Sequence, residues 1–598
     1  MTRGTPAVPM AAAHADEFHL VFPERIYRDL QDVLFPGPES TSDHPFAGKA
    51  ERGAYCVLSR STGENRVSFI AREVLEPESP DDLTINSPNW IIGDDEESDE
   101  AGQSGERQES GIGRYIPGNT DTEDGMESGS DSMYGFQFSD EYRQRALQRA
   151  RELDGGILRI HTHPQGGPLP SKVDRKSAEQ VFSRDADRLP PGAPLAAAII
   201  TEDEAWSARA YEFPARDELL ETYASRIRIV GPARRQGYRK LRSWQPNNYD
   251  GGLDLITAEV HSGNSEQERA IIGSEDIEVA TDEQDSTLQL WGSDGQELLA
   301  DLTVGVVGCG GVGSILAEHL ARLGVGHLVF VDFDRLERAN ANRAQGATPE
   351  DIKQNRLKTH VAKRVAEQAA TAPEFEATVV DGSPVEQDPE YAAVPKLLDC
   401  DIIVSAVDAA RPRKVLDHVA SAHCIPVIDG GSRLHVDDDR MLRPDAKIEI
   451  AATGPGWPCF ECQRVWDSDG VYEEREDPRF RGDRAYVDEE EVADEDDRDP
   501  SVIGINAIAA GMMQRRFKAI TLGIASRLVG TVRVSPLDLD TQWMHTADCR
   551  GEECNRAPLG AGDRHSLLTG TDWAMRTERS DIDMPETRRA VSSFDELR

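Results

Sequence analysis

Short apolar runs alternate with helix-like segments in the first third of the chain, which is typical of an α/β domain. Helical spacing of apolar residues predicts helices at Glu24–Leu34 and at about 140–153. The runs between and after them are short enough for buried strands. Strands are predicted at 51–58, 67–71, 156–160, 196–200 and 205–213. The pattern therefore predicts an α/β domain over residues 17–215.

A second α/β pattern begins near residue 285. The apolar run Leu302–Val307 is followed by a helix-like segment, Ser314–Leu323, and then by a second run, His327–Val331. Strands alternating with helices indicate parallel strands joined by crossovers. Further elements are predicted at 356–368, 401–408, 425–431 and 502–522. We expect a Rossmann-like, doubly wound domain over residues 285–560.

The remaining segments have no such periodicity. Residues 1–16 and 561–598 are predicted to be tails, and 94–132 is predicted to be an acidic loop within the first domain, on composition alone. Residues 216–284 are expected to be a linker or docking segment. A basic group there has two interpretations, the solvated face of a linker helix or a docking surface for an acidic partner. Its members are Arg234, Arg235, Arg239, Lys240 and Arg242.

The charge balance of the 598 residues is strongly acidic. Lys and Arg number 66 and Asp and Glu number 109, for a formal net charge of −43. Such a surface repels nucleic acid and anionic membranes, so neither is expected as a partner. Few Lys with many Asp and Glu also resembles the composition of halophilic proteins. No run approaches 18 apolar residues, and Met1–Ala15 is a poor signal peptide, so a cytoplasmic location is predicted.

Two histidines follow the apolar run 156–160. His161 and His163 stand two positions apart on a predicted strand, so their side chains point to the same side. Asp174 follows after a short loop. Together these side chains can supply three zinc ligands and leave a position open, as in catalytic zinc sites. The alternative is a pair of surface histidines beside a loop rich in Pro and Gly.

The set His161, His163, Ser171 and Asp174 resembles the signature of the JAB/MPN (JAMM) metalloprotease family. The resemblance implies a cytidine-deaminase-like α/β fold and zinc-dependent removal or trimming of ubiquitin-like proteins. It also implies a general base on an early strand, where Glu51 has the matching position. Glu64 and Glu73 are less well placed alternatives. The base takes a proton from the attacking water and passes it to the leaving amine, and Ser171 is expected to donate to the oxyanion.

A glycine-rich turn marks a second chemical centre. Gly308, Gly310, Gly311 and Gly313 lie between a predicted strand and a predicted helix, the context of a nucleotide-binding fingerprint. The glycines let the backbone approach a phosphate at the helix N-terminus. Asp332 ends the next strand, 19 residues on (332 − 313), and can bond ribose hydroxyls. This turn alone suggests NAD as readily as ATP.

The residues after Asp332 resemble the ThiF/MoeB branch of the ubiquitin-activating superfamily. The matching positions are Asp334, Asn340, Asn342, Arg343, Lys358 and Asp408. The resemblance implies MgATP-dependent adenylation of the C-terminal glycine of a ubiquitin-like or sulfur-carrier protein, with Arg343 and Lys358 at the phosphates and Asp408 at Mg²⁺. It also implies a homodimer. The Asp-Asn pair of the family is Asp408-Ala409 here, and the region 467–500 has no Cys for thioester transfer.

Two late cysteine pairs complete the candidate chemistry. Cys459 and Cys462 form a C-x2-C pair, and Cys549 and Cys554 form a C-x4-C pair. Four thiolates make a closed tetrahedral site, so a structural zinc ion is predicted. Catalytic or redox thiols are the alternative.

The sequence thus predicts a fusion of two enzymes that act on the same small protein, with a C-terminal Gly-Gly. The N-terminal domain is expected to trim or remove this modifier with zinc, and the C-terminal domain to adenylate it with ATP and Mg²⁺. The sequence does not identify the modifier. Two other interpretations stay open, an NAD-dependent oxidoreductase fused to a metal-binding module and a non-catalytic scaffold.

Overall fold

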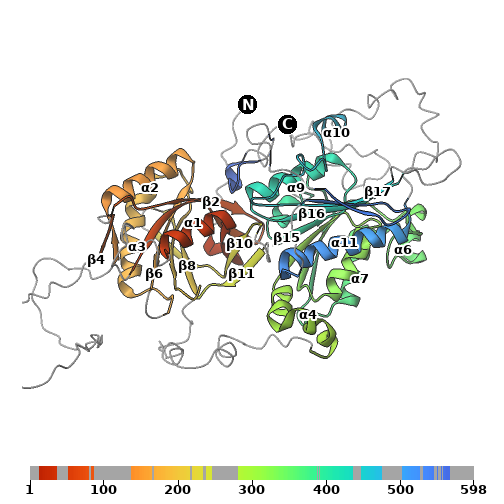
Figure 1. Ribbon diagram of the computed structural model, residues 1–598, viewed down its shortest axis with the longest axis horizontal. Helices are drawn as coiled ribbons and strands as arrows, with labels where there is room; N and C mark the ends of the chain where they lie inside the picture. The colour runs from red at the N-terminus through yellow and green to blue at the C-terminus, as the bar shows by residue number, and fades with distance from the viewer. Residues whose placement is uncertain are drawn as a thin grey trace, which may run out of the picture.

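The computed structural model describes most of both predicted domains. The described residues are 12–36, 51–79, 82–85, 136–163, 167–215, 218–232, 238–244, 281–386, 388, 391–434, 446–474, 501–524, 530–544, 549, 554 and 557–565. Figure 1 shows two sheets with their helices, which follow one another along the long axis of the molecule. The predicted acidic loop 94–132 and the basic residues Arg234 and Arg235 lie outside the described residues.

Among the described residues, nine strands form one mixed sheet in the N-terminal half, which we call the N-terminal sheet. Its order is β11-β10-β1-β3-β2-β6-β7-β8-β9. In chain order the strands are β1 (Glu17–Pro23), β2 (Gly53–Thr62), β3 (Arg66–Leu75), β6 (Gly156–Thr162), β7 (Leu195–Ile200), β8 (Trp206–Ala215), β9 (Glu218–Tyr223), β10 (Arg226–Val230) and β11 (Tyr238–Arg242). A separate hairpin pairs β4 (Leu83–Ile85) with β5 (Phe136–Phe138).

Three helices pack beside this sheet, α1 (Glu24–Leu34), α2 (Asp140–Glu152) and α3 (Lys172–Asp185). Helix α1 buries one apolar stripe that includes Leu30 and Leu34, as its 3.6-residue spacing predicts. Helix α2 begins where the Ser139 hydroxyl accepts the Tyr142 backbone N–H, because a Ser at the N-cap satisfies a free donor of the first turn.

The described part of the C-terminal half holds an eight-stranded sheet, which we call the C-terminal sheet. Its order is β14-β13-β12-β15-β16-β17-β18-β19. The strands from β14 to β16 run parallel, and β17 to β19 continue the sheet antiparallel. They are β12 (Thr303–Val307), β13 (His327–Val331), β14 (Glu376–Val380), β15 (Ile402–Ser405), β16 (Val427–Arg433), β17 (Lys447–Thr453), β18 (Thr531–Val534) and β19 (Thr541–Met544).

The parallel part confirms the predicted Rossmann-like architecture. From the central strand β12 the chain goes first to β13 and β14 and then to β15 and β16 on the other side. Ligands bind where the strand order reverses, at the carboxyl ends of such strands. The helices are α4 (Thr281–Ala300), α5 (Gly313–Arg322), α6 (Pro349–Lys353), α7 (Lys358–Ala369), α8 (Val394–Leu397), α9 (Ala410–Ala422), α10 (Ser468–Glu473) and α11 (Ile503–Leu522).

The segment predicted as a linker differs from the expectation. The described residues 218–232 and 238–242 are not a linker helix but form β9, β10 and β11, of which β9 and β11 are the two edge strands of the N-terminal sheet. Strand β10 pairs in parallel with β1, and β11 pairs with β10. The apolar alternation of Arg226–Val230 is short and carries two Arg, so its burial depends on partners that the sequence does not reveal.

The two halves share buried apolar contacts. Val21, Val230 and Tyr238 of the N-terminal sheet belong to the same hydrophobic cluster as Leu299 and Leu302 at the start of the C-terminal sheet. Strand β11 therefore packs against the C-terminal half, where it contacts helix α11 (Ile503–Leu522). No helix within the described ranges combines the length and apolar character that crossing a membrane requires.

Candidate functional sites

The glycine turn after β12 has the shape that a phosphate loop needs. Gly308 has φ of +87°, and a Cβ there would lie 2.8 Å from the Ala406 carbonyl oxygen. A Cβ on Gly313 would lie 1.8 Å from the Gly308 carbonyl oxygen. At Gly310 no atom lies within 4 Å of such a Cβ, so the backbone is open to a ligand. Helix α5 begins at Gly313 and directs its N-terminus to this turn.

Asp332 anchors the turn from the end of β13. Its carboxylate accepts the backbone N–H groups of Cys309 and Asp334, each at 2.7 Å. Burial raises the pKa of this carboxyl, although Lys358 opposes the shift. Lys358 begins α7 and places its ammonium 2.9 Å from an Asp334 carboxylate oxygen. These contacts hold the lysine beside the glycine turn.

A cleft of about 370 Å³ opens in front of the turn. Of the residues predicted from the sequence, Gly310, Gly311, Asn340, Arg343, Lys358 and Asp408 line it. Four other predicted residues do not line the cleft but shape the turn behind it, namely Gly308, Gly313, Asp332 and Asp334. The Arg343 guanidinium donates to the Ala339 carbonyl at 2.5 Å and to the Asn342 side chain at 3.1 Å, so its position is fixed.

The opposite wall of the cleft consists of residues that the sequence pattern did not single out as functional. Arg413 of α9 forms an ion pair with buried Asp429 at 3.2 Å, and Ser405 also donates to Asp429 at 2.8 Å. The other polar residues of this wall are Ser432, Arg433, Lys447, Glu449, Arg464 and Asn506. Asp429 lies within the predicted element 425–431, which is a signal the sequence offered. Lys447 and Glu449 arrive on the antiparallel strand β17, which no motif marked.

The two histidines and the aspartate of the first centre lie together. His161 Nε2 is 3.5 Å from one Asp174 oxygen, and His163 Nε2 is 3.7 Å from the other. One ligand atom from each residue lies within 4.8 Å of the others. Two imidazole nitrogens and a carboxylate at this separation fit a zinc ion. The geometry brings together the three ligands that the sequence predicts.

Local structure holds this set in place. Strand β6 carries His161, His163 directly follows the end of the strand, and Asp174 sits in the first turn of α3. Ser171 and Asp174 form a capping box, with the Ser171 N–H donating to the Asp174 carboxylate at 2.8 Å and the Asp174 N–H donating to the Ser171 hydroxyl at 3.2 Å. His163 Nδ1 lies 3.0 Å from the Gly167 carbonyl oxygen. Burial lowers the pKa of His161 to about 4, which favours the neutral ligand form.

Of the three candidate bases, Glu51 belongs to this centre. Burial raises the pKa of Glu51, and the charges of His163 and Asp174 act on the same carboxyl. Glu73 is 2.8 Å from Arg149 of α2, and Glu64 is 3.1 Å from Lys396 of the C-terminal half. Both alternatives are therefore held in ion pairs with residues outside the centre.

The four late cysteines also converge. One sulfur from each of Cys459, Cys462, Cys549 and Cys554 lies within 4.8 Å of the others. The Cys459 and Cys554 sulfurs are 3.2 Å apart, and the Cys459 backbone N–H donates to the Cys549 sulfur at 3.1 Å. A closed set of four sulfurs fits a structural zinc ion and leaves no position for a substrate.

Comparison with known proteins places the second centre in a family. Residues 283–523 match the model of the ThiF family. Molybdopterin-synthase adenylyltransferase of Escherichia coli is 26% identical over 169 residues, which cover 28% of this chain and 61% of that protein. The SAMP-activating enzyme E1 of Haloferax volcanii is 30% identical over 172 residues, which cover 29% of this chain and 56% of that protein.

A third relative is named for a different activity. The tRNA threonylcarbamoyladenosine dehydratase of Escherichia coli is 31% identical over 160 residues, which cover 27% of this chain and 57% of that protein. This chain thus spans between 56% and 61% of the length of the three relatives. Among solved structures, MccB of Escherichia coli is similar, with a TM-score of 0.35, 17% identity and coverage of 46% of this chain and 74% of that one. By its match to the family model, the C-terminal region of this chain, residues 283–523, is a ThiF family domain.

Proposed function

We propose that the ThiF family domain adenylates the C-terminal carboxylate of a small ubiquitin-like or sulfur-carrier protein, using MgATP. The observation that carries the proposal is the cleft itself, in which the open backbone at Gly310 faces Arg343, Lys358 and Asp408. The names of the molybdopterin-synthase and SAMP-activating relatives support this substrate class.

The charges in the cleft suit this reaction. A carboxylate oxygen attacks the α-phosphorus of ATP, the bond to the β-phosphate oxygen breaks, and pyrophosphate leaves. Attacking group and phosphate are both anionic, so Arg343 and Lys358 favour the transition state by offsetting their repulsion. Asp408 is the residue of this chain that would hold Mg²⁺, which supplies further neutralisation of the phosphates. The reaction yields an acyl-adenylate and needs no cysteine nucleophile.

The acidic charge of the chain argues against a tRNA substrate like the one in the name of the dehydratase relative. A net charge of −43 repels the phosphate backbone. A homodimer and a cytoplasmic location are further parts of our proposal, the first from the resemblance to the family and the second from the composition.

The product of the reaction gives a test of this proposal. Acid-quenched mixtures of the full chain, MgATP and a Gly-Gly-ended carrier should contain carrier joined to AMP, as detected by mass spectrometry. A carrier that lacks its final glycine is the matched control and should stay unmodified. Tight binding of NAD with no AMP adduct would favour the oxidoreductase interpretation instead.

A second function is favoured by the N-terminal centre. We propose that it is a zinc-dependent peptidase or isopeptidase acting on the same modifier. The family match covers residues 283–523, so this proposal rests on the geometry of His161, His163 and Asp174 with Glu51 beside them. These three ligands would hold zinc, which supplies a Lewis acid and acidifies water. Glu51 accepts a proton from the attacking water and delivers it to the leaving amine, and the Ser171 hydroxyl donates to the oxyanion.

Substitution of the proposed base Glu51 distinguishes a zinc-dependent peptidase from a site that only binds metal. Glu51→Gln should retain zinc and slow the cleavage of a ubiquitin-like fusion by about 10²-fold or more, because it removes the proton acceptor and no ligand. His163→Ala should lose the metal. Glu73→Gln is the control, since Glu73 pairs with Arg149. Cleavage by Glu51→Gln at the wild-type rate would show that another group is the base.

A further inference from the structure

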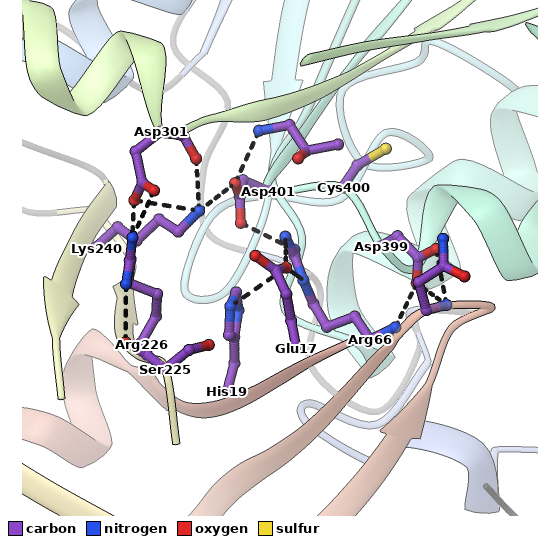
Figure 2. Close-up of polar contacts among 12 residues, drawn as sticks. Glu17, His19, Arg66, Ser225, Arg226, Lys240, Asp301, Asp399, Cys400 and Asp401 are labelled. Carbon is purple, nitrogen blue, oxygen red and sulfur yellow. Dashed lines mark hydrogen bonds and ion pairs between the residues drawn. The ribbon is translucent and has the colours of Figure 1, made fainter. Parts of the chain in front are cut away.

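A group of charged residues centred on buried Asp401 joins the two halves of the molecule (Figure 2). The cations come from the N-terminal sheet and two of the carboxylates come from the amino ends of β12 and β15 in the C-terminal sheet. We call the group the interdomain charge cluster. Its members are Glu17, Arg66, Arg226, Arg228, Lys240, Asp301 and Asp401.

Asp401 is the centre of this cluster. Its carboxylate lies 2.9 Å from Arg66 Nη1 and 3.0 Å from Lys240 Nζ, and Arg228 Nη1 is 3.6 Å away. The Asp401 side chain is 0% exposed, and those of Lys240 and Arg228 are each 1% exposed. Burial alone would raise the pKa of Asp401, but the three cations outweigh it and hold the pKa below its usual value.

Asp301 completes the contact with the N-terminal sheet. Arg226 reaches its carboxylate at 2.7 Å, and Lys240 donates to its backbone carbonyl at 2.7 Å. Lys240 belongs to the basic group that the sequence marked as a possible docking surface for an acidic partner. In the structure the acidic partner of Lys240 is the same chain, because its ammonium lies between Asp301 and Asp401.

The cluster also fixes how two strands of the ThiF family domain align. The Thr303 N–H at the start of β12 donates to the Asp401 carboxylate at 3.0 Å, and the Asp401 N–H donates to the Thr303 carbonyl at 2.8 Å. The carboxyl ends of these strands lead directly into the phosphate loop and into Asp408. Each strand is at most five residues long. A shift of register at the amino end of either strand would therefore also displace its carboxyl end.

Apolar packing and the buried charges contribute differently to this interface. The shared apolar cluster around Val21, Val230 and Leu302 stabilises the interface by burying apolar surface, but this attraction is non-directional and does not select one orientation of the two halves. Buried ion pairs add little net stability, because desolvation offsets their attraction, but removing one partner leaves an unpaired buried charge. Three cations on one carboxylate therefore favour a single arrangement of the two halves and penalise others.

We propose that the N-terminal sheet is a permanent partner of the ThiF family domain within the chain, and that Asp401 is a positioning residue through which this partner sets the strand alignment beneath the nucleotide cleft. The two candidate sites then belong to one rigid body, and neither half acts as an independent module. The inference goes beyond either proposed activity.

Hydrogen exchange of the full chain without nucleotide tests the proposal. In Asp401→Asn, amides of β12, β15 and the turn at 308–313 should exchange about tenfold faster or more, because the cations lose their charge partner. Asp351→Asn is the matched control. Asp351 is also buried and ion-paired, but with Arg364 inside the ThiF family domain, so its loss should leave exchange at β12, β15 and 308–313 unchanged. If Asp401→Asn does not fold, Asp301→Asn provides the same comparison at a partly exposed carboxylate.

A second substitution distinguishes positioning from general weakening. Adding Lys240→Met to Asp401→Asn removes one cation and restores the charge balance, so exchange at 308–313 should return at least halfway to the wild-type rate. Two results would overturn the proposal. One is a wild-type rate of hydrogen exchange at 308–313 in Asp401→Asn. The other is unfolding of the two halves of the wild-type protein in separate transitions. Since no readout involves catalysis, this outcome is independent of whether adenylation occurs.

Discussion

At the residue scale, Lys358 and Arg343 are held at the cleft by contacts with other residues of the ThiF family domain. Lys358 pairs with Asp334, and Arg343 donates to the Ala339 carbonyl. Side chains fixed in this way lose little freedom when a phosphate arrives, which is the advantage of preorganised charge in catalysis. Both residues were predicted from the resemblance to the ThiF/MoeB branch, whose matching positions follow the glycine turn. It could not predict Arg413, because that contact depends on α9 packing beside β16.

Loss of the Lys358 ammonium should therefore affect chemistry more than folding. Lys358→Gln is expected to lower kcat/KM for adenylation by about 10²-fold, because it removes a charge that stabilises the transition state. Lys363→Gln is the control on the same helix, because Lys363 forms an ion pair with Glu367 on that helix, at 3.7 Å. Steady-state kinetics and a melting curve provide the readouts. Equal effects of the two substitutions would contradict the role assigned to Lys358.

At the element scale, segments with a clear apolar period were predicted well. Helix α1 and strand β13 have the predicted bounds, Glu24–Leu34 and His327–Val331. Strands β9 to β11 and β17 to β19 were not predicted as sheet members. Their pairing is long-range, and short strands with charged residues on one face look like linker segments until their partners are known.

The capping box of α3 links an element to the metal site. Ser171→Ala should destabilise the start of α3 by about 1 kcal/mol, because the Asp174 N–H loses its acceptor. Zinc affinity should fall with it, since Asp174 is a proposed ligand. Ser183→Ala, near the other end of the same helix, should change neither quantity. Zinc titration and thermal melting measure both effects. Undiminished zinc affinity in Ser171→Ala would mean that the cap does not position Asp174.

At the scale of the whole molecule, the segment 557–565 bridges the two halves. Asp563 accepts the Thr62 N–H at 3.0 Å and the Thr62 hydroxyl at 2.6 Å, and the Gly560 N–H donates to the Ser421 carbonyl. This segment follows Cys554 closely, so the four-cysteine site holds one end of the bridge. The sequence predicted the site from cysteine spacing, but nothing in the tail composition indicated the bridge.

A loss of one cysteine ligand should therefore loosen the molecule as a whole. Cys459→Ser is expected to lose zinc and lower the melting temperature by several degrees, because metal binding contributes to folding at such sites. Exchange of the Thr62 amide should rise as the bridge loosens. Cys56→Ser, at a buried cysteine outside the set, is the control for zinc content. A reductant-sensitive adduct of carrier on any late cysteine would contradict the purely structural role.

The most direct test of the central claim is the exchange of labelled pyrophosphate into ATP by the full chain. The account predicts exchange that requires magnesium and a carrier with an intact Gly-Gly end, and that disappears in Asp408→Ala, because the acyl-adenylate forms reversibly only when the metal can bind. Two results would contradict the assignment of this cleft to adenylation. The first is tight binding of NAD with no pyrophosphate exchange in the presence of an intact carrier. The second is pyrophosphate exchange that persists unchanged in Asp408→Ala.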